Sequence, residues 1–303
     1  MQSDSPTSRS DRARLALEGL SIGDAFGEQF FSAAVWHSYM ERKELPLPAW
    51  RYTDDTVMAL SIVEILERHG SIHQDDLAEA FHRRYQAEPR RGYGAGAAGL
   101  LRGLFLGGDW RELSRTAFGG TGSFGNGAAM RVAPLGAFFA DDPDAIAEQS
   151  RLSAEVTHAH PEGIAGSIAV ACAAAWAWRW NASGRSEPKR NLLEVAAEIT
   201  PPGETRDGIL RAADIPLDGW NHVAASALGN GSRISAADTV PFCLWCAAAH
   251  LDDYPEALWS AIRVGGDIDT NCAIIGGIVA MAVGKEGIPD EWSVCRESLR
   301  QSQ

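Results

Sequence analysis

Apolar side chains recur with helical spacing along almost all of the 303-residue chain, and many of these segments are rich in alanine. Alanine is the residue that most favours an α-helix, and apolar residues three or four positions apart form one helix face. No series of alternating apolar and polar residues predicts strands. The sequence therefore predicts an all-α fold. Helices are expected over 12–30, 55–68, 75–86, 95–106, 128–139, 143–156, 161–179, 191–199, 221–228, 238–250, 254–263, 269–283 and 290–300.

The same helical texture continues on both sides of segments 181–190 and 201–219, which are rich in Pro, Gly, Ser and charged residues. They are interpreted as surface loops rather than linkers, so residues 10–303 are predicted to form one compact domain, an orthogonal helical bundle. The polar residues 1–9 are predicted to be disordered. Hydrophobic residues make up 45% of the chain, enough for a substantial core.

Charge and hydropathy exclude several classes of partner. The formal net charge of −13 argues against binding to a nucleic-acid backbone, which requires a basic face. No apolar run approaches the roughly 18 residues of a membrane span, and the N-terminus lacks the apolar stretch of a signal peptide. A soluble, cytoplasmic protein that binds no membrane is expected. Its five cysteines are interpreted mainly as buried small apolar residues.

Two acidic clusters stand at the start of predicted helices: Thr53-Asp54-Asp55-Thr56 and Gly265-Gly266-Asp267-Ile268-Asp269-Thr270. Either cluster alone fits helix capping, because Asp and Thr are preferred caps and acids suit the first turn. Together they supply four carboxylates, and adjacent aspartates repel unless a cation lies between them. Oxygen ligands without His or Cys favour Mg²⁺ or Mn²⁺. A site for two such ions, able to activate a water, is therefore predicted.

A glycine-rich segment, Gly119-Gly-Thr-Gly-Ser-Phe-Gly-Asn-Gly-Ala-Ala-Met-Arg131, precedes another predicted helix. Its glycines permit close backbone approach, and its free N–H groups can form a cradle for an anion such as a diphosphate. It matches neither a dinucleotide-binding nor a P-loop motif, so a flexible turn is the alternative. In Thr157-His158-Ala159-His160-Pro161, one histidine could contact a ribose or phosphate oxygen, although this motif alone favours a cap and a surface residue.

The two glycines of Gly23-Asp24-Ala25-Phe26-Gly27 indicate close helix packing or a chain reversal, with a structural role for Asp24. In their order along the chain, this motif, the two acidic clusters, the glycine-rich segment and the histidine motif resemble the ADP-ribosylglycohydrolase family. The matching pieces span residues 19 to about 284. The resemblance implies an all-α fold with a binuclear Mg²⁺ or Mn²⁺ centre in a cleft.

The resemblance also implies roles for individual residues. Metal ligands are expected at Thr53, Asp54, Asp55, Asp267, Asp269 and Thr270, and substrate contacts at Gly122, Ser123, Phe124, Gly125, Asn126, Gly127 and His158. Many family members carry a glutamate where this chain has Phe31. Glu28 is the nearest acid, and a loop after Gly27 could turn it toward the metals. We therefore expect Asp55, Asp269 and Glu28 to be the catalytic residues.

The expected function is metal-dependent hydrolysis of the glycosidic bond at the anomeric carbon of an ADP-ribosyl group. The substrate would be an ADP-ribosylated protein or a small ADP-ribose conjugate, joined through arginine, serine, an acetyl group or another group. Because of Phe31, a non-catalytic, metal-dependent ADP-ribose binding module is an alternative. A structural helical protein whose acidic clusters are only caps is another, and it predicts no stabilisation by divalent metal.

Overall fold

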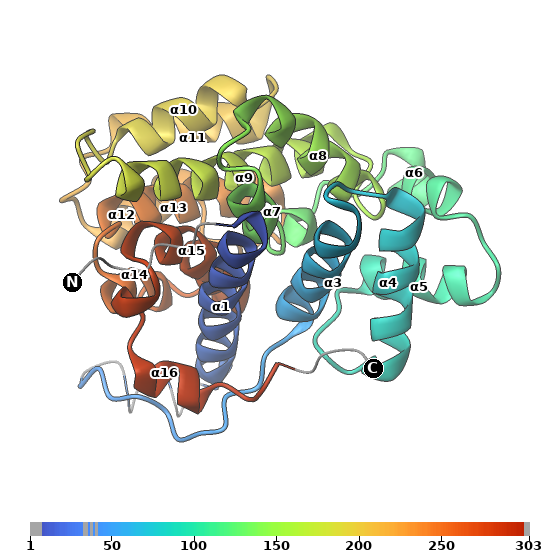
Figure 1. Ribbon diagram of the computed structural model, residues 1–303, viewed down its shortest axis with the longest axis horizontal. Coiled ribbons are helices and arrows are strands. Elements are labelled where there is room, and N and C mark those ends of the chain that lie inside the picture. The colour runs from blue at the N-terminus through green and yellow to red at the C-terminus, as the bar shows by residue number, and fades with distance from the viewer. Residues whose placement is uncertain (1–7, 33–35, 37–38, 40–41, 300–303) are drawn as a thin grey trace.

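The computed structural model describes residues 8–32, 36, 39 and 42–299, and this part of the chain contains helices and no strand (Figure 1). The all-α prediction is confirmed. The elements are α1 (Arg9–Glu28), η1 (Gln29–Phe31), α3 (Asp54–His69), α4 (Gln74–Ala87), α5 (Ala95–Phe105), α6 (Trp110–Gly120), η2 (Asn126–Ala128), α7 (Ala133–Phe138), α8 (Pro143–Glu155), α9 (Pro161–Ala182), α10 (Asn191–Ile199), α11 (Glu204–Asp214), α12 (Asn221–Leu228), α13 (Ala236–Ala249), α14 (Tyr254–Ile262), α15 (Ile268–Val283), η3 (Lys285–Gly287) and α16 (Asp290–Cys295).

Helices α1 and α15 form the most closely packed pair, and Figure 1 shows them side by side. Three glycines spaced four residues apart in α1, namely Gly19, Gly23 and Gly27, allow this approach. A Cβ atom on Gly23 would lie 2.1 Å from the Cys272 carbonyl oxygen, and one on Gly27 would lie 2.7 Å from that of Ile268. The two helices therefore run antiparallel, and the C-terminal end of α1 meets the N-terminal end of α15.

The 22-residue helix α9 is buried along most of its length, because its apolar and small side chains face neighbours on several sides. It packs against α7, α8, α10 and α15, while α3 packs against α1 and α4. One hydrophobic core runs from Ala13 in α1 to Trp292 in α16. All five cysteines are free, and only Cys295 is not fully buried. No helix within the described ranges is long and apolar enough to span a bilayer.

The structure corrects several predicted boundaries. Helix α11 lies inside segment 201–219, which was predicted to be a loop, and α6 was not predicted. The buried face of α11 consists mostly of small residues, which hides its apolar periodicity. The predicted helix 290–300 ends at Cys295, because the following backbone pairs with Trp50 instead. Ser8 caps α1, so the last two residues of the segment predicted to be disordered belong to that helix and its cap; residues 1–7 lie outside the described residues.

Candidate active site

One cavity of about 440 Å³ brings together most of the residues singled out in the sequence. Its predicted lining residues are Asp54, Asp55, Ser123, Phe124, Gly125, Asn126, Gly127, His158, Asp267, Asp269 and Thr270. Other lining residues, for which no role was predicted, are Met58, Gly92, Gly94, Ala95, Gly96, Ala97, Phe118, Met130, Arg233 and Ile234. Thr53, Gly122 and Glu28 do not line it.

Buried Asp24 fixes the first acidic cluster in place. Its carboxylate accepts hydrogen bonds from the backbone N–H groups of Thr53 and Thr56 at 2.9 and 3.1 Å. It also accepts from their hydroxyl groups, at 2.9 Å for Thr53 and 2.5 Å for Thr56. Asp24 thus holds the N-terminal turn of α3 against α1, which gives the structural role expected for this residue a definite geometry.

Asp54 and Asp55 lie in the first turn of α3, where Thr53 is the N-cap. Both are buried, and Asp55 Oδ2 has no hydrogen-bond partner among the described residues. Burial, with the nearby Asp24 charge, raises the pKa of Asp54 to about 7. Burial and the charges of Asp24 and Asp269 raise the pKa of Asp55 well above its usual range. A cation bound between these carboxylates would offset their mutual repulsion.

The second acidic cluster begins α15. Gly265 and Gly266 lead into the helix with φ values of +68° and +84°, and a Cβ atom on Gly266 would lie 2.0 Å from the Asn230 carbonyl oxygen. Asp267 accepts a 2.7 Å hydrogen bond from Asn126 Nδ2. Burial, then the Asp267 and Asp24 charges, raises the pKa of Asp269 well above normal. These glycines permit a left-handed backbone and a close approach to Asn230, and the turn they form delivers two further carboxylates to the cavity.

The donor set fits hard divalent cations. Four carboxylates converge from the N-terminal ends of α3 and α15; those of Asp54 and Asp55 are buried, and those of Asp267 and Asp269 are partly buried. Burial, followed by charges from this set and from Asp24, raises the pKa values of Asp54, Asp55 and Asp269. Asp55 Oδ2 is buried without a hydrogen-bond partner among the described residues. Helix capping does not account for this arrangement, because a cap uses one side chain and Asp267 makes no capping hydrogen bond. Oxygen donors alone favour Mg²⁺ or Mn²⁺ over zinc.

The glycine-rich segment runs along the cavity, and its residues have different surroundings. Gly122, with φ +75°, packs against the backbone of Ala159 and His160. The buried Asn126 donates from Nδ2 to Thr239 Oγ1 at 3.0 Å as well as to Asp267. Asn126 therefore positions an acid of the second cluster, a role that its place in a glycine-rich segment did not indicate.

A hydrogen-bonded chain fixes the protonation of His158. Arg131 Nη2 donates to Thr157 Oγ1 at 2.8 Å, and that oxygen lies 2.7 Å from His158 Nδ1. The Thr157 hydroxyl has no other acceptor within the described part of the chain, so its proton goes to Nδ1. Burial, then the Arg131 charge, lowers the pKa of His158 to about 3. The neutral ring therefore carries its proton on Nε2.

His158 Nε2 faces the glycine-rich segment. A Cβ atom on Gly125 would lie 3.3 Å from this nitrogen, and one on Gly127 would lie 3.0 Å from it. Two glycines thus leave room for the imidazole, which lines the cavity as a hydrogen-bond donor.

Aromatic side chains lie where the cavity meets solvent. Phe118 and Phe124 are 58% and 46% exposed, and their ring centroids are 6.3 Å apart. Phe118 has a φ of +52°, a left-handed conformation that is unfavourable for a residue with a side chain. Strain of this kind often marks functional positions. Phe118 lies in the distorted last turn of α6, directly before the glycine-rich segment, and no role in the cavity was predicted for it.

Glu28 ends α1 and is solvent-exposed. The expected loop after Gly27 is absent, because the helix continues through Glu28 and passes into η1. Its charge contributes to the raised pKa of Asp269, so the helix itself brings Glu28 near the second acidic cluster. Phe31 is 53% exposed and does not line the cavity.

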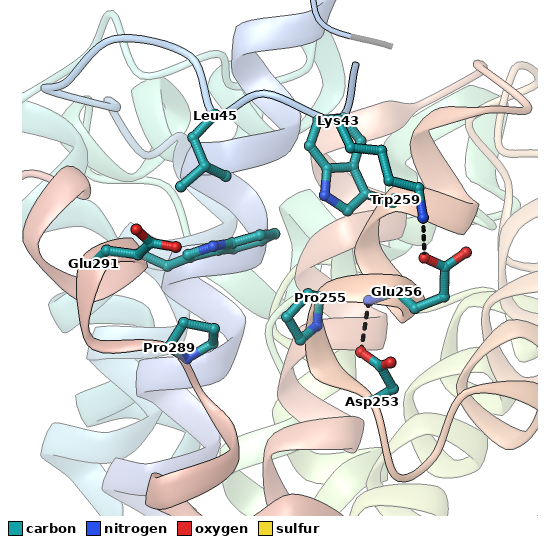
Figure 2. A pocket seen from close by; sticks show the side chains of 9 residues that line it. Lys43, Leu45, Asp253, Pro255, Glu256, Trp259, Pro289 and Glu291 are labelled. Atoms are coloured by element: carbon teal, nitrogen blue, oxygen red, sulfur yellow. Dashed lines mark hydrogen bonds and ion pairs between the residues drawn. The ribbon is translucent and has the colours of Figure 1, made fainter. Parts of the chain in front are cut away.

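A second hollow, of about 330 Å³, lies beside α14 and α16 (Figure 2). The Lys43 ammonium pairs with Glu256 across it at 2.5 Å, as the dashed line in Figure 2 shows. Its two tryptophans, Trp259 and Trp292, are almost fully buried in the core. None of the residues predicted to bind metal or substrate lines this hollow.

Comparisons with known proteins agree with the family resemblance seen in the sequence. The family model described as ADP-ribosylglycohydrolase matches residues 5–301. The chain is 29% identical to ADP-ribosylhydrolase ARH3 of Mus musculus, covering 96% of this chain and 89% of that protein. It is 22% identical to ADP-ribosyl-[dinitrogen reductase] glycohydrolase of Rhodospirillum rubrum, covering 93% and 89%. A solved structure named ADP-ribosylglycohydrolase-related protein complex superposes with a TM-score of 0.68 at 25% identity, covering 96% and 93%.

Proposed function

The chain belongs to the ADP-ribosylglycohydrolase family and hydrolyses the glycosidic bond of an ADP-ribosyl group; on this premise we propose that its hydrolysis depends on two divalent cations, Mg²⁺ or Mn²⁺, held by the two acidic clusters. The substrate is an ADP-ribosylated protein or a small ADP-ribose conjugate. Relatives named as hydrolases of such groups support an enzyme over the alternative of a binding module without activity.

The observation that carries the proposal is the convergence of four carboxylates on one cavity, two of them buried and two partly buried, with no hydrogen-bond partner for Asp55 Oδ2 among the described residues. The residues that would hold the ions are Thr53, Asp54, Asp55, Asp267, Asp269 and Thr270. Both threonines flank these carboxylates in sequence. Thr270 lines the cavity, and Thr53 does not. When bound, such cations orient ribose hydroxyl groups and make a water more acidic.

The protein's own groups would bind the rest of the substrate. His158 offers a neutral Nε2–H donor beside the glycine-rich segment, which suits an anionic diphosphate oxygen or a ribose oxygen. The exposed rings of Phe118 and Phe124 offer faces on which a flat adenine can stack. Binding of these remote parts would hold the anomeric carbon beside the acidic clusters.

Proton handling is assigned to the carboxylates at the acidic clusters. Asp55 and Asp269 would orient the attacking water, and Glu28 would accept or deliver a proton at the edge of the site. Support for Glu28 comes from its charge, which contributes to the raised pKa of Asp269, and from the raised pKa of its own carboxyl group, which is partly desolvated although the residue is exposed. The bond would break through an oxocarbenium-like state, which nearby carboxylates stabilise.

A substrate panel tests the proposal. ADP-ribosyl-arginine, ADP-ribosyl-serine and O-acetyl-ADP-ribose are incubated with chelator-treated protein, then with Mg²⁺ or Mn²⁺, and released ADP-ribose is quantified. We expect release from at least one conjugate only after metal is restored. Equal release in the presence of excess chelator would contradict the metal dependence, and the identity of the cleaved conjugate would define the linkage.

A further inference from the structure

Three potential metal ligands gather at the corner where α3 ends and α4 begins, at the far end of α3 from Asp54 and Asp55. The ligand atoms of His69, His73 and Asp76 all lie within 4.8 Å of one another. At 1.5 Å per residue, this corner is about 22 Å along the helix from the acidic cluster. It is therefore separate from the proposed catalytic centre.

We propose that His69, His73 and Asp76 form a surface site for a transition-metal ion such as Zn²⁺. Two imidazoles and one carboxylate are a common ligand set for such ions, and the accessible position leaves room for water as a further ligand. Imidazole nitrogen favours Zn²⁺, Cu²⁺ or Ni²⁺, whereas the all-oxygen catalytic centre favours Mg²⁺ or Mn²⁺. The two sites therefore differ in the ion that they select.

Helix-end chemistry accounts for two of the three residues but not for His73. A basic residue in the last turn of α3 and an acid in the first turn of α4 suit the helix dipoles, and His69 Nε2 lies 2.7 Å from Asp76 Oδ2. His73 occupies the N-cap position of α4, yet its side chain makes no capping hydrogen bond. Its ring stacks on His69 with centroids 4.1 Å apart and planes at 17°.

Binding an ion requires a change of side-chain rotamer, because the two stacked rings lie in nearly parallel planes and a metal ion lies in the plane of each imidazole that binds it. Zn²⁺ lies about 2.0–2.2 Å from nitrogen or oxygen ligands, so tetrahedral ligand atoms stand about 3.3 Å apart. The contact between His69 and Asp76 lengthens by less than about 1 Å to reach this spacing, and exposed side chains can make such a shift by rotation. Rotation of one of these accessible imidazoles turns its nitrogen lone pair toward an ion held by the other imidazole and Asp76. The bound ion would link α3 to α4.

Zinc titration by calorimetry tests the site in full-length protein, with excess Mg²⁺ present to occupy the acidic centre. We expect His69→Ala and His73→Ala each to weaken Zn²⁺ binding at this site at least tenfold. His222→Ala is the matched control, since His222 is an exposed histidine on α12 outside the cluster, and it should bind Zn²⁺ like the wild type. Thermal unfolding gives a second readout: Zn²⁺ should raise Tm in the wild type and not in the double variant.

Equal zinc affinity and stoichiometry in the wild type and the His69→Ala/His73→Ala double variant would overturn the proposal. If Mg²⁺ displaced all of the bound zinc, and the double variant bound as much zinc as the wild type without Mg²⁺, the zinc would belong to the acidic centre. That result would also overturn the proposed surface site. Neither readout uses hydrolase activity, so the test stands apart from the proposed function. All three substituted histidines are accessible, and their variants should unfold at the wild-type temperature without zinc.

Discussion

Asp55 is buried and lies among other carboxylates, and no basic side chain pairs with it among the described residues. Its Oδ2 is buried without a partner, and several neighbouring carboxylates raise its pKa. We expect Asp55→Asn to lower the rate of hydrolysis by about 100-fold or more. Changing the hydrogen-bond partners of metal ligands already lowers activity by about 10–100-fold, and Asp55 is proposed to be a ligand itself. The same change should leave metal-free stability unchanged or higher, because it removes a buried charge.

Differential scanning fluorimetry with and without Mg²⁺ separates these effects. Asp144→Asn is the control, an exposed aspartate in the first turn of α8; it should keep both activity and the metal-induced rise in Tm. An Asp55→Asn protein with normal turnover and a normal Mg²⁺ response would remove Asp55 from the proposed metal ligands.

Thr157 sets the tautomer of His158, and its hydroxyl is also the acceptor for buried Arg131. Thr157→Val should weaken ADP-ribose binding about tenfold and destabilise the protein by about 1–3 kcal/mol, the usual cost of an unpaired buried polar group. Thr157→Ser should restore both. Imidazole ¹⁵N shifts report the tautomer directly, and we expect Nε2–H in the wild type and the serine variant.

The low pKa of His158, about 3, adds a pH prediction for the same residue. Since the ring stays neutral, its contribution to ADP-ribose affinity should not change between about pH 5 and pH 8. Titration of the His158 signal itself near the ordinary histidine value of about 6.5 would contradict the assigned hydrogen-bonded chain.

Glu28 is the predicted catalytic residue with the least support from the cavity geometry. If it handles a proton, Glu28→Gln should lower kcat by about 10²–10⁴-fold, because it keeps the shape and loses the exchangeable charge. Metal binding, measured as the Mg²⁺-induced rise in Tm, should be unchanged. Glu79→Gln, an exposed glutamate on α4, is the control. A near wild-type kcat would assign proton transfer to the acidic clusters alone.

At the scale of the element, the α1–α15 contact sets the spacing of the two acidic clusters. Gly23→Ala would place a methyl group 2.1 Å from the Cys272 carbonyl oxygen and force the helices apart. We expect a loss of about 1–3 kcal/mol or more from overpacking, with reduced activity. Gly99→Ala in α5 is the matched control: its Cβ meets nothing within 4 Å, so stability should rise by about 0.5–1 kcal/mol. Urea unfolding measures both, and equal stabilities would contradict the close contact.

Helices with a strong apolar stripe were predictable, and those without one were not. Helix α3 has buried apolar residues at helical spacing and ends at Gly70, which adopts a φ of +74°. Helix α11 buries Thr205 and Gly208 beside Ile209 and Ala212, so its inner face does not look apolar in sequence. Its contact with α13 comes from close approach of small residues, a feature that hydrophobic periodicity does not register.

At the scale of the whole molecule, short motifs predicted the acidic clusters but not the links between them. The two carboxylates of each cluster lie within two positions of each other at the start of a helix, so each cluster is visible in the local sequence. The bond from Asn126 to Asp267 joins residues 141 positions apart, and Asp24 meets Thr53 across 29. Phe118 reaches the cavity from the distorted end of α6, just outside the glycine-rich segment. Such contacts depend on the complete fold, and sequence patterning alone did not reveal them.

The carboxyl groups of Asp24 and Asp54 make the stability of the whole protein depend on pH and on bound metal. Burial, opposed by its hydrogen bonds, raises the pKa of Asp24 to about 6, and burial with the Asp24 charge raises that of Asp54 to about 7. An unfolded aspartate titrates near about 3.9. Between about pH 4 and pH 7 the folded, metal-free protein therefore holds protons that the unfolded chain has released. In that window the free energy of unfolding falls as pH rises.

Denaturant unfolding of chelator-treated protein across this range measures the slope. We expect Asp54→Asn to reduce the fall, because it removes one of the titrating groups, while Asp144→Asn keeps the wild-type slope. Saturating Mg²⁺ should raise stability most near pH 7–8, since cations favour ionised carboxylates and the metal-free protein carries its largest repulsion there. If Asp54→Asn and the wild type showed identical slopes with and without Mg²⁺, the buried carboxylates would not be the groups that couple proton release to metal binding.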